Sequence, residues 1–208
     1  MAANQPAVGP QNNPDGPTLI TARAGKQGEQ MVSELHARYY EQTYRKNMFQ
    51  ASAVGVTTSA GTSTTYTGLA LSNPIGSPVN LVINKVSLSF LVAFAVTSAL
   101  GIMVGSSGVT NTVHTTPAVQ GPAFVGSGVA SYGLADQAAT LPATPTVRVV
   151  LGAGLTGAIT VASEQPGLLY DLEGSLILPP GAFMAFYTST ASGASGGCFS
   201  IQWEEVPV

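Results

Sequence analysis

The sequence has little charge and a single cysteine among its 208 residues. Cys198 alone cannot form a disulfide within the chain, and a structural zinc site built on thiolates needs several cysteines. Lys and Arg number 7 and Asp and Glu 10, so charged residues make up 8% of the chain. About 25% is usual for a soluble domain. The missing charge is the first property that a structural interpretation has to explain.

The negative net charge of the chain argues against one class of partner, nucleic acids. The formal net charge is −3 at pH 7, whereas a nucleic-acid-binding protein neutralises phosphates with clustered Lys and Arg. We therefore expect no nucleic-acid partner. The opening MAANQPAVGPQNNPDGP has neither a basic nor an apolar segment, so no secretory signal is expected.

Apolar residues are plentiful, at 45% of the chain, and Gly and Pro number 24 and 14. This Gly and Pro content is below the level that is typical of low-complexity disorder. The length suits one domain and rarely two. We therefore expect a single folded domain with a sizeable core.

The few charges are unevenly placed, and this divides the chain. Between Asn47 and Ala135 the only charged residue is Lys85. Most of the basic residues precede this stretch, together with four prolines, which remove backbone donors; the residues are Arg23, Lys26, Arg38, Arg45, Lys46, Pro6, Pro10, Pro14 and Pro17. The sequence predicts an extended N-terminal arm over residues 1–50 and a β-sandwich domain over residues 51–208.

The end of the arm has a helical pattern. In residues 29–46, Glu34 precedes Arg38 and Glu41 precedes Arg45 by four positions, the orientation that favours ion pairs on one helix face. This spacing predicts a short helix within the arm.

From about Phe49 onward the pattern becomes that of β-strands. Apolar and polar residues alternate in residues 85–90 and again in residues 199–204, so each strand has one buried and one wetter face. The apolar run 182–187 and the last strand, separated by the loop 189–197, are expected to form a closing hairpin. Further strands are expected at 66–71, 146–151, 158–162 and 168–178. Many short strands predict an antiparallel sandwich, with a jelly roll as the favoured topology.

Residues 86–104 allow two interpretations. They form a run of 19 uncharged, largely apolar residues (VSLSFLVAFAVTSALGIMV), which is long enough for a transmembrane helix. Their first half alternates with period 2, however, and Thr97 and Ser98 interrupt the run. Two core strands joined near Thr97 explain the same residues without a bilayer, and we expect no membrane partner.

One segment matches a nucleotide-binding motif. Gly152, Gly154 and Gly157 have the spacing G-x-G-x-x-G, with Glu173 downstream. The motif binds a dinucleotide only where the third glycine opens a helix. The following AITVASEQ is β-branched and soon meets a Pro-Gly pair. The alternative is a glycine-rich loop between strands, and we expect no cofactor.

Candidate catalytic and metal-binding residues are scarce. His36 and His114 lie in no recognisable motif, and no G-x-S-x-G surrounds a serine. Asp171 and Glu173 would share one strand face and could act as paired carboxylates or as half of a metal site. The adjacent Glu204 and Glu205 would face opposite ways. Solvated strand charges are the simpler explanation of all four. We expect no metal site, no catalytic residues and no enzymatic activity.

One cluster of side chains fits a binding surface. Three tyrosines lie among three basic residues outside the strand region, and together they offer a large amphipathic surface; the residues are Arg38, Tyr39, Tyr40, Tyr44, Arg45 and Lys46. The alternative is that the segment packs back on its own sandwich. Trp203, with Phe199 and Ile201, is expected to be a core anchor.

Several blocks of the sequence carry a resemblance to a known group. The blocks are HARYYE (36–41), RKNMF (45–49), VTTSAGTSTTYTGLALSNPIGSPVNLVI (56–83) and the ending FSIQWEEVP (199–207). In this order they resemble uncharacterised virion proteins of tailed bacteriophages, from about Thr21 to the C-terminus. The resemblance implies a β-sandwich virion component and no catalytic residues. It implies most directly a capsid decoration or cement protein, with a head-fibre or tail adaptor as the near alternative.

A virion role has physical consequences for partners. Long arms order on a neighbouring subunit, where interface burial offsets the lost entropy, and a charge-poor body leaves few charges to desolvate. We therefore expect a homo-oligomer, a trimer, on the capsid surface, made in the host cytoplasm and bound to the major capsid protein or a neighbouring virion protein. A carbohydrate- or receptor-binding jelly-roll module is the competing interpretation, and it predicts an exposed aromatic patch on the sandwich.

Overall fold

A computed structural model of the chain describes residues 37–154 and 167–208. The chain divides between Tyr40 and Glu41 into two units. Residues 37–40 belong to the first unit, and all the strands belong to the second. The fold described below is that of the second unit.

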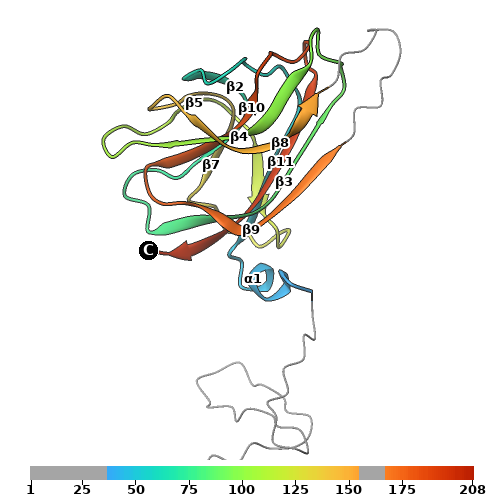
Figure 1. Cartoon of the computed structure of the whole chain (residues 1–208). Helices are drawn as coiled ribbons and strands as arrows, with labels where there is room; N and C mark the ends of the chain where they lie inside the picture. Colours follow the sequence, from blue (N-terminus) through green and yellow to red (C-terminus); the bar gives the residue numbers. More distant parts are fainter. Residues whose placement is uncertain (1–36, 155–166) are drawn as a thin grey trace, which may run out of the picture. The chain divides into compact units, whose positions relative to one another are not determined.

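Two antiparallel sheets form the body of the protein (Figure 1). The five-stranded sheet has the order β6 (Val119–Pro122), β1 (Met48–Val56), β11 (Gly197–Pro207), β3 (Val79–Phe90) and β9 (Leu168–Leu178). The six-stranded sheet has the order β5 (Val113–Pro117), β7 (Leu134–Thr140), β2 (Thr65–Ser72), β10 (Ala182–Thr188), β4 (Ser98–Ser106) and β8 (Thr146–Gly154). The predicted antiparallel sandwich is confirmed.

The strand order is that of a jelly roll. Early strands pair with late ones in four nested antiparallel pairs, namely β1 with β11, β2 with β10, β3 with β9 and β4 with β8. The four pairs form one long two-stranded ribbon. When this ribbon curls into two sheets, β11 lies beside β3 and β10 beside β4, as in a jelly roll. The segment between β4 and β8 adds β5 and β7 to one sheet and β6 to the other.

The core lies between the two sheets. Phe199, Ile201 and Trp203 on β11 are all buried, as their alternation predicts. Phe199 packs against Phe186 of the other sheet, with ring centroids 4.8 Å apart, and against Phe90 at 5.8 Å. Aromatic contacts of this kind add to the burial of apolar area. The contact with Phe186 joins the two sheets, whereas Phe90 lies on the neighbouring strand of the same sheet as Phe199.

A bulge in β3 changes which residues face the core. Val86, Leu88 and Phe90 are buried, but so are Leu81 and Ile83, which have the opposite parity. The change occurs at Asn84, because Gln202 of β11 pairs with Lys85 whereas the next residue, Trp203, pairs with Ile83. One extra residue therefore lets both halves of β3 contribute apolar side chains to the core.

The closing hairpin predicted from the C-terminal pattern is wrong. β10 pairs with β2 and β4, whereas β11 pairs with β1 and β3 in the opposite sheet. The loop between them therefore crosses from one sheet to the other. Both strands have an apolar face that must be covered, and in this fold the opposite sheet covers it.

Residues 86–104 form the end of β3, a connection over residues 91–97, and most of β4. This is the two-strand arrangement that the sequence allowed, with the strands in different sheets. No helix within residues 37–154 and 167–208 is long and apolar enough to cross a membrane.

The helical pattern of the arm produces one short helix in the described residues, α1 (Tyr40–Tyr44). The predicted pair of Glu41 and Arg45 forms, at 2.7 Å. β1 begins at Met48, ahead of the predicted boundary between residues 50 and 51. The rest of the predicted arm and helix, and the strand predicted at 158–162, lie outside the described residues.

Candidate functional site

The residues predicted to bind a partner lie in and around α1. Arg38 and Tyr39 precede the helix, Tyr40 and Tyr44 are its first and last residues, and Arg45 and Lys46 follow it. Lys46 has a positive φ of 66°. The N–H of Asn47 donates to the carbonyl of Gln42 and the N–H of Lys46 to that of Thr43. This Schellman pattern ends the helix and directs the chain into β1.

The side chain of Tyr44 contacts an aromatic residue that is distant in the sequence. Its ring stacks on Phe124, in the loop between β6 and β7, with ring centroids 6.3 Å apart. Both rings stay exposed, at 56% for Tyr44 and 40% for Phe124, and the neighbouring Val125 is 88% exposed. The N–H of Ala123 donates to the carbonyl of Met48, which ties this loop to the start of β1.

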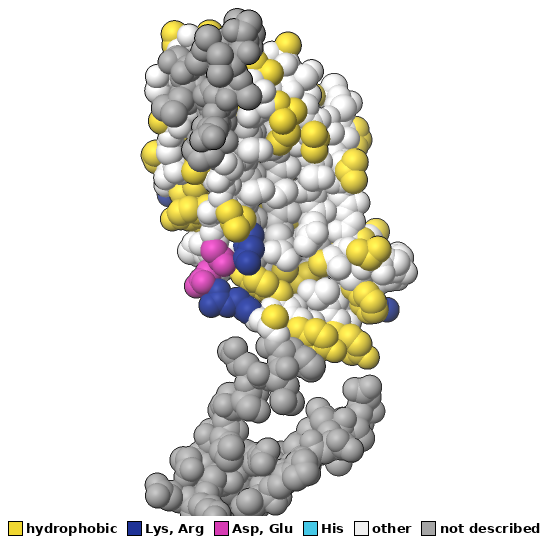
Figure 2. Space-filling view, turned by 90° about the vertical axis from the view of Figure 1, so that its right-hand side faces the viewer, with side chains coloured by type: hydrophobic (Ala, Val, Ile, Leu, Met, Phe, Trp, Pro, Cys, Tyr) yellow, Lys and Arg dark blue, Asp and Glu magenta, His cyan; other side chains and the backbone are white. Residues whose placement is uncertain are grey.

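We call Tyr44, Arg45, Lys46, Phe124 and Val125 the base surface. Figure 2 shows hydrophobic side chains close to basic and acidic ones at the lower end of the sandwich. The sequence interpretation found the helical half of this surface and missed Phe124 and Val125. Their signal in the sequence is weak: they belong to a run of three apolar residues, 123–125, between Pro122 and Gly126.

The buried carboxylate of Glu205 holds the far end, residues 131–133, of the loop between β6 and β7. Oε1 of Glu205, on β11, accepts hydrogen bonds from Ser131 Oγ at 2.5 Å and from the N–H groups of Tyr132 at 2.9 Å and Gly133 at 3.1 Å. Nε1 of Trp203 lies 3.5 Å from the same oxygen. Glu205 is 7% exposed, so its interpretation as a solvated strand charge is wrong. A carboxylate can stay buried where donors converge on it.

Gly133 makes this contact possible. A Cβ atom at position 133 would lie 2.8 Å from Cδ1 of Leu81 and 3.3 Å from Nε1 of Trp203. A larger residue would have to displace Leu81 in the core, so glycine favours the close approach by which Glu205 binds the N–H groups of the loop.

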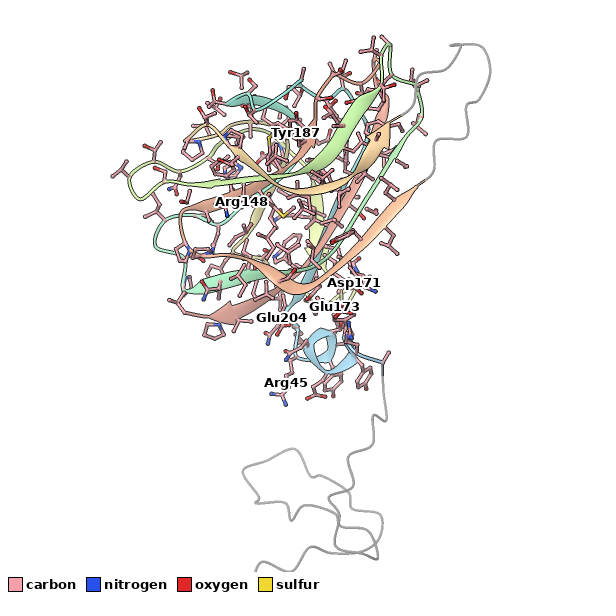
Figure 3. The ribbon with its side chains drawn as sticks, viewed as in Figure 1. Arg45, Arg148, Asp171, Glu173, Tyr187 and Glu204 are labelled. Atoms are coloured by element: carbon pink, nitrogen blue, oxygen red, sulfur yellow. The ribbon has the colours of Figure 1, made fainter. Side chains whose placement is uncertain are left out.

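The other carboxylates are more exposed. Asp171 and Glu173 are exposed on β9, on either side of the buried Leu172, and Asp171 lies 3.8 Å from Nζ of Lys85. Glu204 is half-buried, and burial raises the pKa of its carboxyl group. Figure 3 shows Asp171, Glu173 and Glu204 at the lower end of the five-stranded sheet. No group of three potential metal ligands occurs within the described ranges 37–154 and 167–208.

His114 forms a second buried polar contact. Its Nδ1 is hydrogen-bonded to Oδ2 of Asp136 on the neighbouring strand β7. Asp136 is 1% exposed, and its other oxygen has no hydrogen-bond partner among the described residues. Burial raises the pKa of Asp136, and the hydrogen bond and charge of His114 offset part of that rise. The pair joins the two strands β5 and β7.

Substitution of His114 by alanine is expected to lower the free energy of unfolding by about 2 kcal/mol at neutral pH, because Asp136 loses its partner. With the folded-state pKa of Asp136 raised, its protonated form stabilises the fold at low pH, and that contribution is lost as the pH rises through the folded-state pKa. Without His114, which lowers the pKa of Asp136, that pKa rises further in the variant. Protonation of Asp136 at low pH therefore stabilises the variant more than the wild type, and the deficit should shrink toward pH 4. Urea unfolding of the variant and the wild type at neutral pH and at pH 4 measures the deficit, with Thr115→Ala as the control on the same strand. A deficit that is larger at low pH would contradict this account.

The other residues singled out in the sequence, namely the glycines of the nucleotide-binding motif, Cys198 and Trp203, lie on strands of the sandwich where the structure describes them. Gly152 and Gly154 lie in the last residues of β8, and the third glycine of the motif is outside the described residues, as is His36. Cys198 is half-buried on β11, opposite Val54 of β1. Trp203 is fully buried, as expected.

The fold and the base surface together define a jelly-roll sandwich with an exposed aromatic and basic surface at one end. Comparison with known proteins gives no match: no family model, no curated protein and no solved structure is significantly similar to the chain.

Proposed function

We propose that this protein is a structural component of a tailed-phage virion, a capsid decoration or cement protein that docks on the shell through its base surface. The resemblance of the sequence blocks and the jelly-roll fold, which is common in viral capsid proteins, support this role. The observation that carries the docking site is the exposed stack of Tyr44 on Phe124.

The chemistry of the base surface suits a protein partner. Aromatic side chains bury a large area with few rotatable bonds, and they are enriched where protein interfaces are strongest. Lys46 adds positive charge beside the stack, whereas the charge of Arg45 is paired with that of Glu41 at 2.7 Å. An acidic group on the partner opposite Lys46 is therefore favoured. The bonds of Glu205 to Tyr132 and Gly133 hold one end of the loop in place, so less ordering is needed on binding.

The low charge of the body is consistent with assembly. Most of the exposed large apolar side chains lie on strands and loops of the sandwich, and a trimer with further contacts to the shell would cover some of them. A head-fibre or tail adaptor would use the same kind of surface on a different neighbour. The binding experiment therefore includes both heads and tails.

The double substitution Tyr44→Ala and Phe124→Ala is expected to weaken binding of the full chain to purified phage heads at least tenfold, since central aromatic residues dominate interface energies. Co-sedimentation with heads assembled without this protein measures the affinity. Tyr170→Ala, an exposed tyrosine on β9, is the matched control and should bind like the wild type.

Unchanged binding of the double variant to heads would refute the docking site. Binding of the wild-type chain to isolated tails, with none to heads, would favour the adaptor role and refute the decoration role. Thermal unfolding of each variant separates a lost contact from a lost fold.

A further inference from the structure

A hollow lies on the outer face of the five-stranded sheet, on the side of these strands that faces away from the core. Its volume is about 460 Å³, within the range of ligand-binding clefts. All five strands of this sheet contribute residues to its lining.

The register of the sheet explains the hollow. Ser52 on β1 pairs with Ser200 on β11, which pairs with Ser87 on β3, so three small hydroxyl side chains lie in a row across the sheet. The hydroxyls of Ser87 and Ser200 are 2.6 Å apart. At the ends of this row, Val119 on β6 and Leu169 on β9 are 74% and 71% exposed. The result is a polar floor between two apolar rims.

A second row adds amide groups. Gln50 on β1 pairs with Gln202 on β11, and Gln202 pairs with Lys85 on β3. Each glutamine offers both a donor and an acceptor. Asp171 lies 3.8 Å from Nζ of Lys85, so the charges beside the hollow balance. The lining is therefore neutral and can both donate and accept hydrogen bonds.

We propose that this hollow binds a neutral oligosaccharide. Sugar hydroxyls both donate and accept hydrogen bonds, which matches the amides of Gln50 and Gln202 and the hydroxyls of Ser52 and Ser200. The C–H faces of a sugar ring suit the apolar rims at Val119 and Leu169. A phosphate or sulfate would instead need cations without a balancing carboxylate. An extended peptide adds to a sheet through free backbone groups at an edge, and the central strands here are paired on both sides.

The test uses the full chain and an array of neutral gluco-, galacto- and manno-oligosaccharides, with sialylated, sulfated and phosphorylated glycans beside them. Wild-type protein is expected to bind one or more of the neutral oligosaccharides. The double substitution Gln50→Ala and Gln202→Ala is expected to weaken that binding at least tenfold in calorimetric titration. Gln137→Ala, a half-buried glutamine on β7 in the other sheet, is the matched control and should bind like the wild type.

A second variant, Ser52→Phe, fills the floor of the hollow from the outer face and should abolish binding while the thermal midpoint stays within a few degrees of the wild type. The proposal is overturned if no neutral glycan binds at millimolar concentration, if only the acidic glycans bind, or if the two glutamine substitutions leave the affinity unchanged. The base-surface variants should bind the glycan normally, so this proposal and the docking proposal can fail separately.

Discussion

Substitution of Trp203 by alanine is expected to lower the free energy of unfolding by about 4 kcal/mol, the largest effect we predict for a single side chain. The indole is fully buried and stacks on Phe49, with ring centroids 6.0 Å apart. Alanine would leave a cavity in the core between the two sheets, which the hydrogen-bonded strands β1 and β11 cannot move to close. Domains of this size are stable by about 5–15 kcal/mol, so the variant should lose a large part of its stability.

Urea unfolding followed by circular dichroism measures the loss. Trp203→Phe keeps an aromatic ring against Phe49 and should lose about 1–2 kcal/mol. Val150→Ala, at a side chain that is 73% exposed, should change stability by less than about 0.5 kcal/mol. If Trp203→Ala were no more damaging than Trp203→Phe, the indole would not be the core anchor described here.

Substitution of Glu205 by alanine is expected to lower the free energy of unfolding by about 3 kcal/mol, because it leaves several buried donors without an acceptor. The N–H groups of Tyr132 and Gly133 both bond to its Oε1. Glu205→Gln keeps an acceptor oxygen and loses only the charge, so about 1–2 kcal/mol is expected. Urea unfolding at neutral pH measures both variants.

The neighbouring glutamate provides the control. Glu204 faces the other side of the sheet, and burial raises its pKa, so its charged form is disfavoured in the folded state. Glu204→Gln should therefore leave stability unchanged or slightly higher at neutral pH. Equal losses for the two Gln substitutions would contradict the assignment of Glu205 as the residue that anchors the loop.

The buried carboxylates of Glu205 and Asp136 show what the local sequence leaves undecided. Alternation along β11 places Glu204 and Glu205 on opposite faces, and this prediction is confirmed. The same alternation puts Glu205 on the core face with Trp203. It does not reveal that a carboxylate can be accommodated there, because the donors that bind Glu205 come from residues 131–133. Asp136 is similar, since its partner His114 lies on another strand. A charge in a strand pattern can thus be solvated or buried, depending on a distant loop.

One part of the candidate docking site, the residues around α1, could be predicted from the sequence. The tyrosines and basic residues around α1 are neighbours along the chain, so their clustering could be predicted. The contact of Tyr44 with Phe124 could not, because the loop that carries Phe124 is positioned by the pairing of β6 with β1. The hollow on the outer face is likewise a property of register, since its serines and glutamines come from separate strands.

The sequence by itself determined the fold class, the position of most strands and a few core residues, among them Phe199, Ile201 and Trp203. These follow from local periodicity, because an alternating strand can bury only its apolar face. Only the tertiary structure decided that β10 and β11 belong to different sheets, that Asn84 bulges, and that Glu205 is buried. Strand pairing depends on contacts between residues far apart in the chain, and a period of two is the same whichever strand lies alongside.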